Sequence, residues 1–474
     1  MTSQTYNRKT IVALLLGGAF ISILNQTTMI TAIPPIMKEM HVSANTAQWL
    51  TTVFMLVNGV MIPVTAFLIE RFSTRQLFIS AMSIFAFGTL IAGIAPNFGA
   101  LLLGRIIQSA GAGIMMPLMQ TVFLLIYPIH KRGAAMGLVG LVIQFAPAIG
   151  PTLSGWLISA YSWRVMFFVI LPIALLLIGI GTRAMQNVTE LTRPKVDILS
   201  IILSSFGFGG LLYGFTSAGN LGWGHIITIS TLGIGVIALV LFIVRQLRLA
   251  HPMLEFRVFK YSIFTLTTGI GMLAFVGLIG IETLLPLYMQ NMRDFTAMES
   301  GLAILPGALV MGLMSPITGR IFDKIGAKWL AITGLIIMTL TTFPFVSLTT
   351  NTSFAYLTIF YAIRMFGLSM VMMPVTTAGL NQLPKRLIAH GTAMNNTMRQ
   401  VSASIGTAII VTVMTTTGEG ARQDPSIVNP MIHGVNVAFM VITVLSIIGV
   451  IFAFFIKKTY PPEEAGESES VKNR

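Results

Sequence analysis

Few side chains of this 474-residue sequence could do chemistry within its long apolar runs. Away from their ends, those runs contain one acidic residue, Glu282, and three basic residues, Arg105, Arg364 and Arg399. An ionisable group surrounded by hydrocarbon is costly, so it usually serves a function or pairs with another group. We weigh two roles for Glu282. It is either a carrier that alternates between a charged and a protonated form, or a structural glutamate that partners an arginine or reaches the outer interface.

The remaining residue types argue against an enzyme. The sequence has no cysteine, no G-x-S-x-G pattern and no H-E-x-x-H pattern. Its six histidines fall in loops or at the ends of apolar runs. A phosphate-binding G-x-x-x-x-G-K-[ST] loop is also absent, which argues against ATP as the source of energy. We therefore expect no catalytic residues, no metal site and no cofactor.

Composition places these residues in a membrane. Hydrophobic residues make up 55% of the chain and charged residues 9%, with a mean hydropathy of +0.85. A water-soluble domain has about 25% charged residues. The net charge of +14 would suggest nucleic acid on a soluble protein, but here the basic residues lie in short loops between apolar runs. We therefore attribute the charge to membrane topology and expect no nucleic-acid partner.

Windows of about 20 apolar residues, the length that crosses a bilayer, predict fourteen spans. They lie near residues 11–33, 48–69, 77–95, 100–127, 133–158, 164–184, 197–218, 225–245, 261–289, 299–319, 328–348, 353–382, 391–416 and 435–456. The first run is too long for a signal peptide and lacks a cleavage site, so it counts as a span. The fold class is thus an all-α polytopic membrane protein with 14 transmembrane helices.

The positions of lysine and arginine predict the orientation. If the N-terminus is cytoplasmic, 22 of the 29 Lys and Arg residues fall in inner segments, four in outer segments and three within spans. Positive charge accumulates on the cytoplasmic side of membrane proteins. We therefore expect a multi-pass cell-membrane protein with both termini in the cytoplasm.

An internal duplication divides the chain. The Met-Met-Pro sequence ending at Pro117 recurs at Pro374, 257 residues later, and the Gly-x-Ala-Met sequence ending at Met136 recurs at Met394, 258 residues later. The shift of eight spans is even, so the two copies have parallel orientation. This predicts a six-helix bundle in residues 1–184, two inserted helices in 185–260, a second six-helix bundle in 261–458 and a cytoplasmic tail in 459–474.

Several motifs in this order resemble the major facilitator superfamily, specifically its fourteen-span drug:proton antiporter branch. They are PVTAFLIERFSTR at 63–75 with a second copy GRIFDKIG at 319–326, LGRIIQSAGAG at 103–113, and APAIGPTLSG at 146–155. SWR at 162–164 and LYG at 212–214 resemble this branch in particular. NQTT at 25–28, followed by Pro34 and Pro35, is most similar to lincomycin-resistance-type multidrug exporters.

The resemblance implies a bacterial cell membrane as the location. It also implies roles for individual residues. Arg105 is expected to take part in proton coupling, together with Glu282. The two loop motifs are expected to form a conformational latch, because a carboxylate there can cap a helix N-terminus and cations can bind helix C-terminal carbonyls. The latch residues are Glu70, Arg71, Arg75, Arg320, Asp323 and Lys324. The hinge and packing residues of the fifth span are Gly150, Pro151 and Gly155.

Asn25 departs from the branch, which usually has an aspartate at this position. Because an asparagine does not titrate near neutral pH, a simple copy of the family's coupling scheme does not fit this chain.

We expect a central cavity lined by spans 1, 4, 5, 9, 12 and 13, with spans 7 and 8 packed outside. Arg364 and Arg399 either hold helices in place or make that cavity positive. The expected cargo residues are Asn25, Gln26, Thr28, Gln108, Gln144, Arg364, Asn395 and Arg399.

Together these features predict a secondary active multidrug exporter rather than an enzyme. It would exchange amphipathic small molecules, such as lincosamide-like antibiotics, for protons by alternating access. The alternative is an exporter of an anionic metabolite, lipid or signalling molecule, which the three arginines within spans favour. The expected partners are the small-molecule substrate, protons and membrane lipids, and the expected oligomeric state is a monomer.

Overall fold

A computed structural model describes residues 7–189, 191–192, 194–425 and 427–457; the predicted tail at 459–474 lies outside them. The described chain is helical, without strands, and contains fourteen helical segments that are long and apolar enough to cross a membrane. The predicted fold class and number of spans are therefore confirmed. The helices are α1 (Arg8–Met40), α2 (Ala44–Arg71), α3 (Thr74–Gly93), α4 (Phe98–Ile126), α5 (Arg132–Ala160), α6 (Val165–Ala184), α7 (Ile198–Leu221), α8 (Ile226–Arg248), α9 (Ser262–Met292), α10 (Ala297–Ile325), α11 (Ala327–Thr342), α12 (Phe354–Ser369), α13 (Met372–Leu380), α14 (Ile388–Ala421) and α15 (Pro430–Phe454).

Polar residues in the short loops fix where the helices start. Ser43, Asn97 and Ser353 each accept a hydrogen bond from a backbone N–H in the first turn of the helix that follows. Ser73 and Thr296 begin α3 and α10 with reciprocal capping boxes. Such caps satisfy N–H groups that have no partner within the helix, and an unsatisfied N–H is expensive in or near hydrocarbon.

The twelfth span, which the sequence predicted as one segment near residues 353–382, is divided into α12 and α13. Met370 and Val371 separate the two helices, and Pro374 lies in the first turn of α13. A proline removes one backbone donor and its ring collides with the carbonyl four residues earlier, here that of Met370. The helix is therefore interrupted at the Met-Met-Pro sequence, whereas α4 continues through Pro117.

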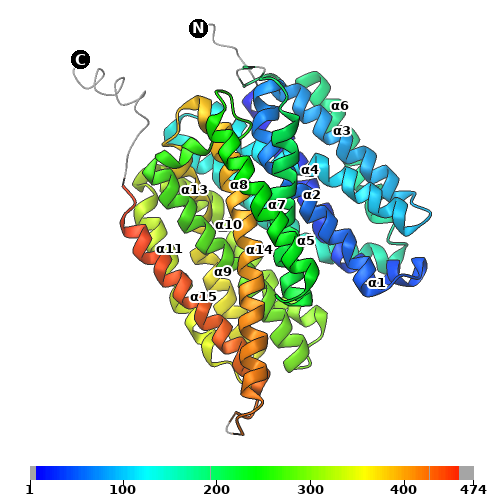
Figure 1. Ribbon diagram of the computed structural model, residues 1–474, viewed down its shortest axis with the longest axis vertical. Helices are drawn as coiled ribbons and strands as arrows, with labels where there is room; N and C mark the ends of the chain where they lie inside the picture. Colours follow the sequence, from blue (N-terminus) through cyan, green and yellow to red (C-terminus); the bar gives the residue numbers. More distant parts are fainter. Residues whose placement is uncertain (1–6, 190, 193, 426, 458–474) are drawn as a thin grey trace.

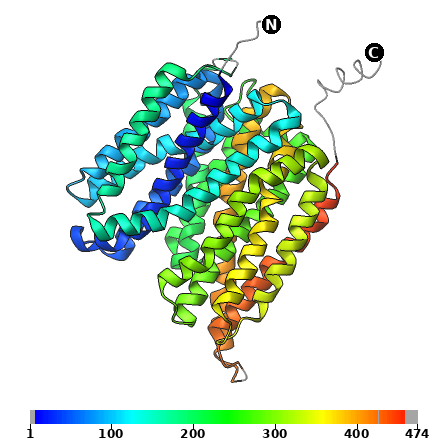
Figure 2. The same cartoon turned by 180° about the vertical axis from the view of Figure 1, so that it is seen from behind.

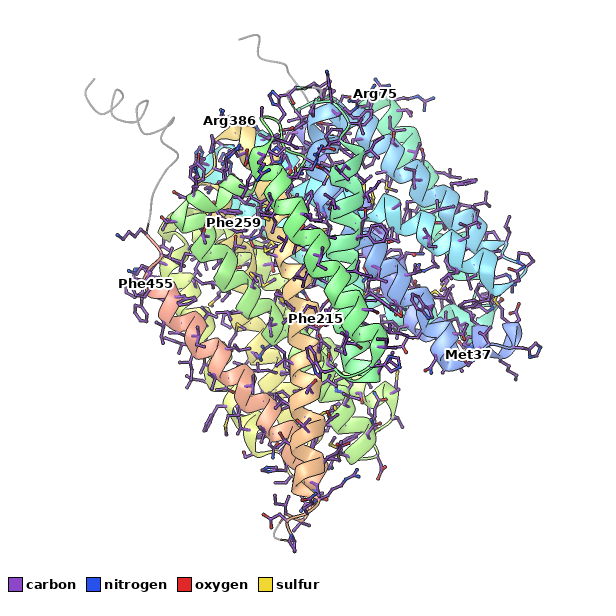
Figure 3. The ribbon with its side chains drawn as sticks, viewed as in Figure 1. Met37, Arg75, Phe215, Phe259, Arg386 and Phe455 are labelled. Atoms are coloured by element: carbon purple, nitrogen blue, oxygen red, sulfur yellow. The ribbon has the colours of Figure 1, made fainter. Side chains whose placement is uncertain are left out.

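The helices form two groups, α1–α6 and α9–α15 (Figure 1). One apolar core lies mainly in the first group and extends onto α9, α13 and α14, a smaller one lies within the first group, and another lies within the second group. We call the end of the molecule where α1 begins and α15 ends the terminal end, and the other the distal end. Contacts between the groups run mainly from α5 to α10 and from α2 to α14. The groups diverge toward the distal end in both views (Figures 1 and 2). Arg75 of the first group and Arg386 of the second lie at the terminal end, far from Met37 (Figure 3).

The inserted helices α7 and α8 lie on the outside of the bundle and pack chiefly against each other. In addition, α7 contacts α2 of the first group and α14 of the second. The pair therefore covers one seam between the two groups. The sequence predicted that these helices pack outside the bundle, but not at which place.

Candidate functional site

A buried polar network around Arg105 occupies the interior of the first group. Arg105 on α4 is fully buried, and its Nη1 donates hydrogen bonds to Asn25 Oδ1 at 2.5 Å and Gln108 Oε1 at 2.7 Å. Its Nε donates to the carbonyl of Leu50 at 3.2 Å, and its guanidinium lies 4.2 Å from the centre of the Phe54 ring. An arginine keeps its proton, so these contacts hold a permanent positive charge between α1, α2 and α4.

A second buried arginine occupies the second group, close enough to a carboxylate for their charges to interact. Arg364 on α12 is fully buried, and its Nε donates to Thr342 Oγ1 on α11 at 3.0 Å. Both Nη atoms are enclosed without a hydrogen-bond partner, as is the Tyr361 hydroxyl. The charges of Glu282 on α9 and Arg364 interact electrostatically, although no direct ion pair joins them among the described residues. Glu282 is half-buried.

The two sites occupy corresponding helices of the duplicated halves. Asn25 and Glu282 belong to the first helix of each half and are 257 residues apart, and Arg105 and Arg364 belong to the fourth and are 259 apart. The repeat itself has a spacing of 257 at Pro117. Each half thus places a polar group of its first helix toward the arginine of its fourth, but only the second half uses a titratable one.

A third set of polar groups lies along α14, where it faces α9 and α4. Asn395 Nδ2 donates to Thr268 Oγ1 at 3.4 Å, and the Arg399 guanidinium lies 4.7 Å from the centre of the Phe275 ring. Arg399 is 6% exposed, and its Nε and Nη1 have no hydrogen-bond partner. A buried guanidinium with unused donors can accept an anionic or carbonyl group of a ligand.

The expected cargo residues divide among these sites, and hydrogen bonds do not connect them into one cluster. Asn25 and Gln108 belong to the Arg105 network, and the buried Thr28 donates to the carbonyl of Asn25 on its own helix. Gln26 is half-buried, and Gln144 is a buried residue of α5 that lies near Gly312 of α10. Arg364, Asn395 and Arg399 belong to the second group.

Two carboxylates of the latch motifs reach across to the other group at the terminal end. Asp323 on α10 accepts hydrogen bonds from the N–H groups of Gly133 at 2.7 Å and Ala134 at 2.9 Å, in the first turn of α5. Glu70 Oε1 on α2 lies 2.9 Å from His390 Nε2 in the first turn of α14. A carboxylate at a helix N-terminus satisfies free N–H groups and interacts favourably with the helix dipole.

The basic latch residues make different contacts. Arg71 Nη1 donates to the carbonyl of Pro194 at 2.7 Å, and Arg75 donates to the carbonyl of Thr182. Neither bond reaches the second group, because Pro194 lies in the linker before α7 and Thr182 lies on α6. Arg320 and Lys324 are exposed at the end of α10, beside Asp323.

The hinge and packing residues lie in a continuous α5. The helix runs without a break through Pro147 and Pro151. A Cβ at Gly150 would collide with the side chain of Thr27 on α1, so Gly150 permits close packing of α1 and α5. A Cβ at Gly155 would meet nothing within 4 Å.

Sequence reasoning missed His390 and the link between Asn396 and Gln120. Asn396 Nδ2 on α14 donates to Gln120 Oε1 on α4 at 2.7 Å, which also connects the two groups. The repeat contained a signal for His390, because it precedes the Gly-x-Ala-Met sequence of α14 just as Arg132 precedes that of α5. Arg132 likewise bonds across the groups, from Nη1 to Asn381 Oδ1 at 2.9 Å.

Comparison with known proteins identifies this architecture. The family described as Major Facilitator Superfamily matches residues 15–407. The chain belongs to this superfamily. A Bacillus subtilis relative named "Uncharacterized MFS-type transporter YcnB" is 58% identical, over 97% of this chain and 98% of its own length. The lincomycin resistance protein LmrB of the same species is 43% identical, over 96% of this chain and 97% of its own.

Solved structures support the same assignment of the fold. The human organic anion transporter MFSD10 superimposes with a TM-score of 0.67, over 94% of this chain and 99% of that one, at 11% sequence identity. The superfamily likeness inferred from the motifs is thus confirmed, as is the similarity to lincomycin-resistance exporters. The chain is a multi-pass membrane transporter of this superfamily.

Proposed function

We propose that this transporter exports amphipathic drugs in exchange for protons by alternating access, with Glu282 as the proton carrier. The observation that carries the proposal is the placement of Glu282 near Arg364. A carrier must be charged in one conformation and neutral in another, and a carboxylate facing an unsatisfied arginine can do so when their separation changes. The likeness to lincomycin resistance proteins and to the multidrug export protein EmrB of Haemophilus influenzae supports drugs as the cargo.

Arg105 is proposed to support coupling from the first half. Asn25 accepts a hydrogen bond from its guanidinium without adding a titratable group, so this half provides a fixed charge. The proposed cargo residues are the polar side chains named above; among the described residues, Asn25, Arg364 and Arg399 have buried donors without a hydrogen-bond partner.

The terminal end is proposed to face the cytoplasm, because most lysines and arginines lie in the segments at that end. The conformation described here would then be closed to the cytoplasm, through the contacts of Asp323 and Glu70. We propose residues 1–184 and 261–458 as the two moving halves of a monomer, with 185–260 inserted between them.

A second candidate, an exporter of anionic molecules, is favoured by Arg399. Its buried Nε and Nη1 atoms have no hydrogen-bond partner among the described residues. A cargo carboxylate or phosphate would supply one, in line with the strength of charge-assisted hydrogen bonds.

The test is transport by the purified protein in liposomes with an imposed pH gradient. Cationic dyes, lincomycin and an anionic dye are offered in parallel. The expected result is uphill movement of lincomycin or the cationic dyes. A protonophore, which dissipates the pH gradient, should abolish this movement. Uphill movement of the anionic dye alone would favour the second candidate, and transport indifferent to the pH gradient would exclude proton exchange.

A further inference from the structure

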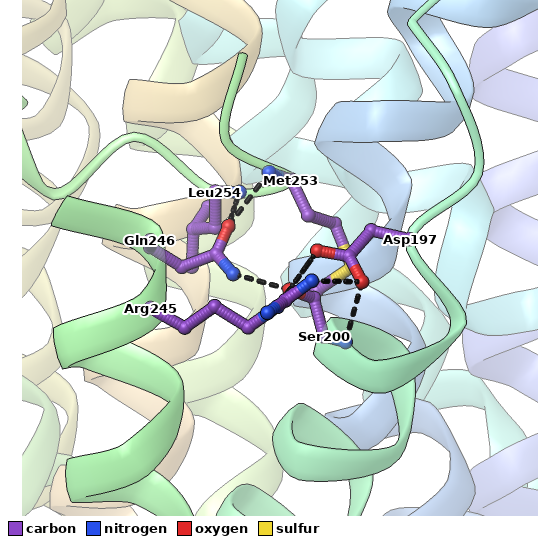
Figure 4. Close-up of polar contacts among 6 residues, drawn as sticks. All are labelled: Asp197, Ser200, Arg245, Gln246, Met253 and Leu254. Atoms are coloured by element: carbon purple, nitrogen blue, oxygen red, sulfur yellow. Dashed lines mark hydrogen bonds and ion pairs between the residues drawn. The ribbon is translucent and has the colours of Figure 1, made fainter. Parts of the chain in front are cut away.

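The inserted helices and their two linkers form one connected unit at the terminal end. Asp197, the N-cap of α7, binds Arg245 on α8 through two contacts of 3.0 Å (Figure 4). Gln246 Nε2 donates to Ser200 Oγ at 2.6 Å, and Gln246 Oε1 accepts from the N–H of Met253 at 2.7 Å. Burial raises the pKa of Asp197, but the hydrogen bonds from Arg245 and Ser200 outweigh it, so the pKa lies below its usual value. The ion pair is therefore retained at neutral pH.

The linker that precedes α7 is attached to the first group. The N–H of Thr192 donates to the carbonyl of Glu70 at 3.1 Å, and Arg71 Nη1 donates to the carbonyl of Pro194 at 2.7 Å. Both contacts are at the last turn of α2. The unit is thus bonded to the same residue, Glu70, whose carboxylate reaches α14.

The linker that follows α8 is attached to the second group. The N–H of Glu255 donates to His390 Nδ1 at 3.3 Å. Since Nδ1 is then the acceptor, the ring proton lies on Nε2, which donates to Glu70 Oε1 at 2.9 Å. The second linker therefore fixes both the tautomer and the direction of the histidine that completes the contact between α2 and α14.

A further attachment lies in the turn between α7 and α8. Trp223 Nε1 donates to Thr412 Oγ1 on α14 at 2.7 Å. Thr412 uses its own proton on the carbonyl of Ala408, so its oxygen is free to accept. The unit made of the inserted helices and their linkers is thereby bonded to α14 at two places, His390 and Thr412. These residues lie about 33 Å apart at helical rise.

We propose that the inserted helices act as a strap, which positions Glu70 and His390 and holds α2 against α14 while the terminal end is closed. The strap is defined as α7, α8 and the described linker residues 185–189, 191–192, 194–197 and 249–261. Opening of the terminal end separates α2 from α14 there, and the strap, which is bonded to both, resists this separation. The inference rests on the alternating access of the proposed function, but not on the identity of the cargo or on proton coupling.

The test measures the conformational equilibrium when one attachment is removed. Thr412→Val keeps the shape of the side chain but removes the acceptor for Trp223, whereas Thr412→Ser retains it. The natural sequence has no cysteine, so introduced pairs are the sole spin-labelling sites. Arg183→Cys with Arg386→Cys reports the terminal end, and Ile94→Cys with Val428→Cys the distal end. Distances are measured in liposomes without cargo or a pH gradient.

One hydrogen bond contributes about 1 kcal/mol, so Thr412→Val should lower the ratio of closed to open terminal ends about fivefold. Thr412→Ser should restore the parent distribution. Thr416→Val is the matched control, because Thr416 donates only within α14, to the carbonyl of Thr412, and it should leave the distribution unchanged. Identical distributions for Thr412→Val and the parent would overturn the strap. If Thr412→Val shifts the conformational distribution but the parent protein exports no cargo, only the proposed function is contradicted, and the strap is supported.

Discussion

Glu70 on α2 and His390 on α14 connect the two halves of the transporter directly, with 2.9 Å between Oε1 and Nε2. Asp323 on α10 connects them again, through the first turn of α5. The two acids are 253 residues apart and begin the corresponding loops of the repeat. Equivalent contacts therefore hold the closed terminal end together at both seams between the groups. Glu70 contacts a histidine side chain, whereas Asp323 accepts from backbone N–H groups.

The cap that Asp323 places on α5 should stabilise the closed terminal end. Asp323→Asn keeps one acceptor oxygen but loses the negative charge and the second acceptor. Since caps and charges at a helix N-terminus contribute about 1 kcal/mol, we expect a severalfold loss of the closed state, with cargo affinity changed little. Cross-linking of cysteine pairs at the terminal end measures this. Lys385→Gln, which changes an exposed residue next to Arg386 at the same end, is the control. An unchanged cross-linking rate in Asp323→Asn would show that the cap does not hold the halves.

Close approach of α5 and α10 depends on two facing glycines. A Cβ at Gly133 would collide with the carbonyl oxygen of Gly319, and a Cβ at Gly319 with that of Gly133. Gly133→Ala should therefore separate these helices, at a cost of about 1–3 kcal/mol to the closed terminal end. The labelled pair at the terminal end should report a longer distance. Gly155→Ala on the same helix meets nothing within 4 Å and should behave as the parent. Equal distances in both variants would contradict this prediction.

Glu282 should be required for coupling and not for cargo binding. Glu282→Gln has the shape of the protonated residue, so uphill export driven by a pH gradient should be lost. Counterflow of cargo without a gradient should survive. Both are measured in liposomes at matched protein amounts. Glu299→Gln, an exposed cap at the start of α10, is a control that keeps coupling. If Glu282→Gln pumps as well as the parent, the carrier lies elsewhere or protons do not drive transport.

Asn25 should stabilise the first half rather than carry protons. Asn25→Ala leaves the buried Arg105 without one of its acceptors. Hydrogen bonds to a charged group contribute about 2 kcal/mol, so we expect a lower midpoint of thermal unfolding in detergent. Gln26→Ala removes a half-buried neighbour and should cost much less. Equal midpoints for both variants would show that the Arg105 network tolerates the loss.

Much of the fold could be predicted from sequence, because the bilayer imposes simple constraints. The length of the apolar runs, the asymmetry of lysine and arginine and the repeat at Pro117 and Pro374 indicated fourteen spans in two related halves. Burial of backbone polar groups in hydrocarbon permits little besides helices, so the run lengths fix the elements. The interruption of the twelfth span at Met370 was not predicted, since the same Met-Met-Pro sequence does not break α4.

The sequence by itself also identified Glu282, Arg105, Arg364 and Arg399 as the ionisable groups within the spans, because each is costly in hydrocarbon wherever it points. Which partner each one meets depends on helix rotation and packing, which no local pattern encodes. Only the tertiary structure decided that Arg105 bonds to Asn25, while Arg364 lies close enough to Glu282 for their charges to interact. It also decided that His390 completes a contact with Glu70, since residues 320 positions apart meet only once the two halves are packed together.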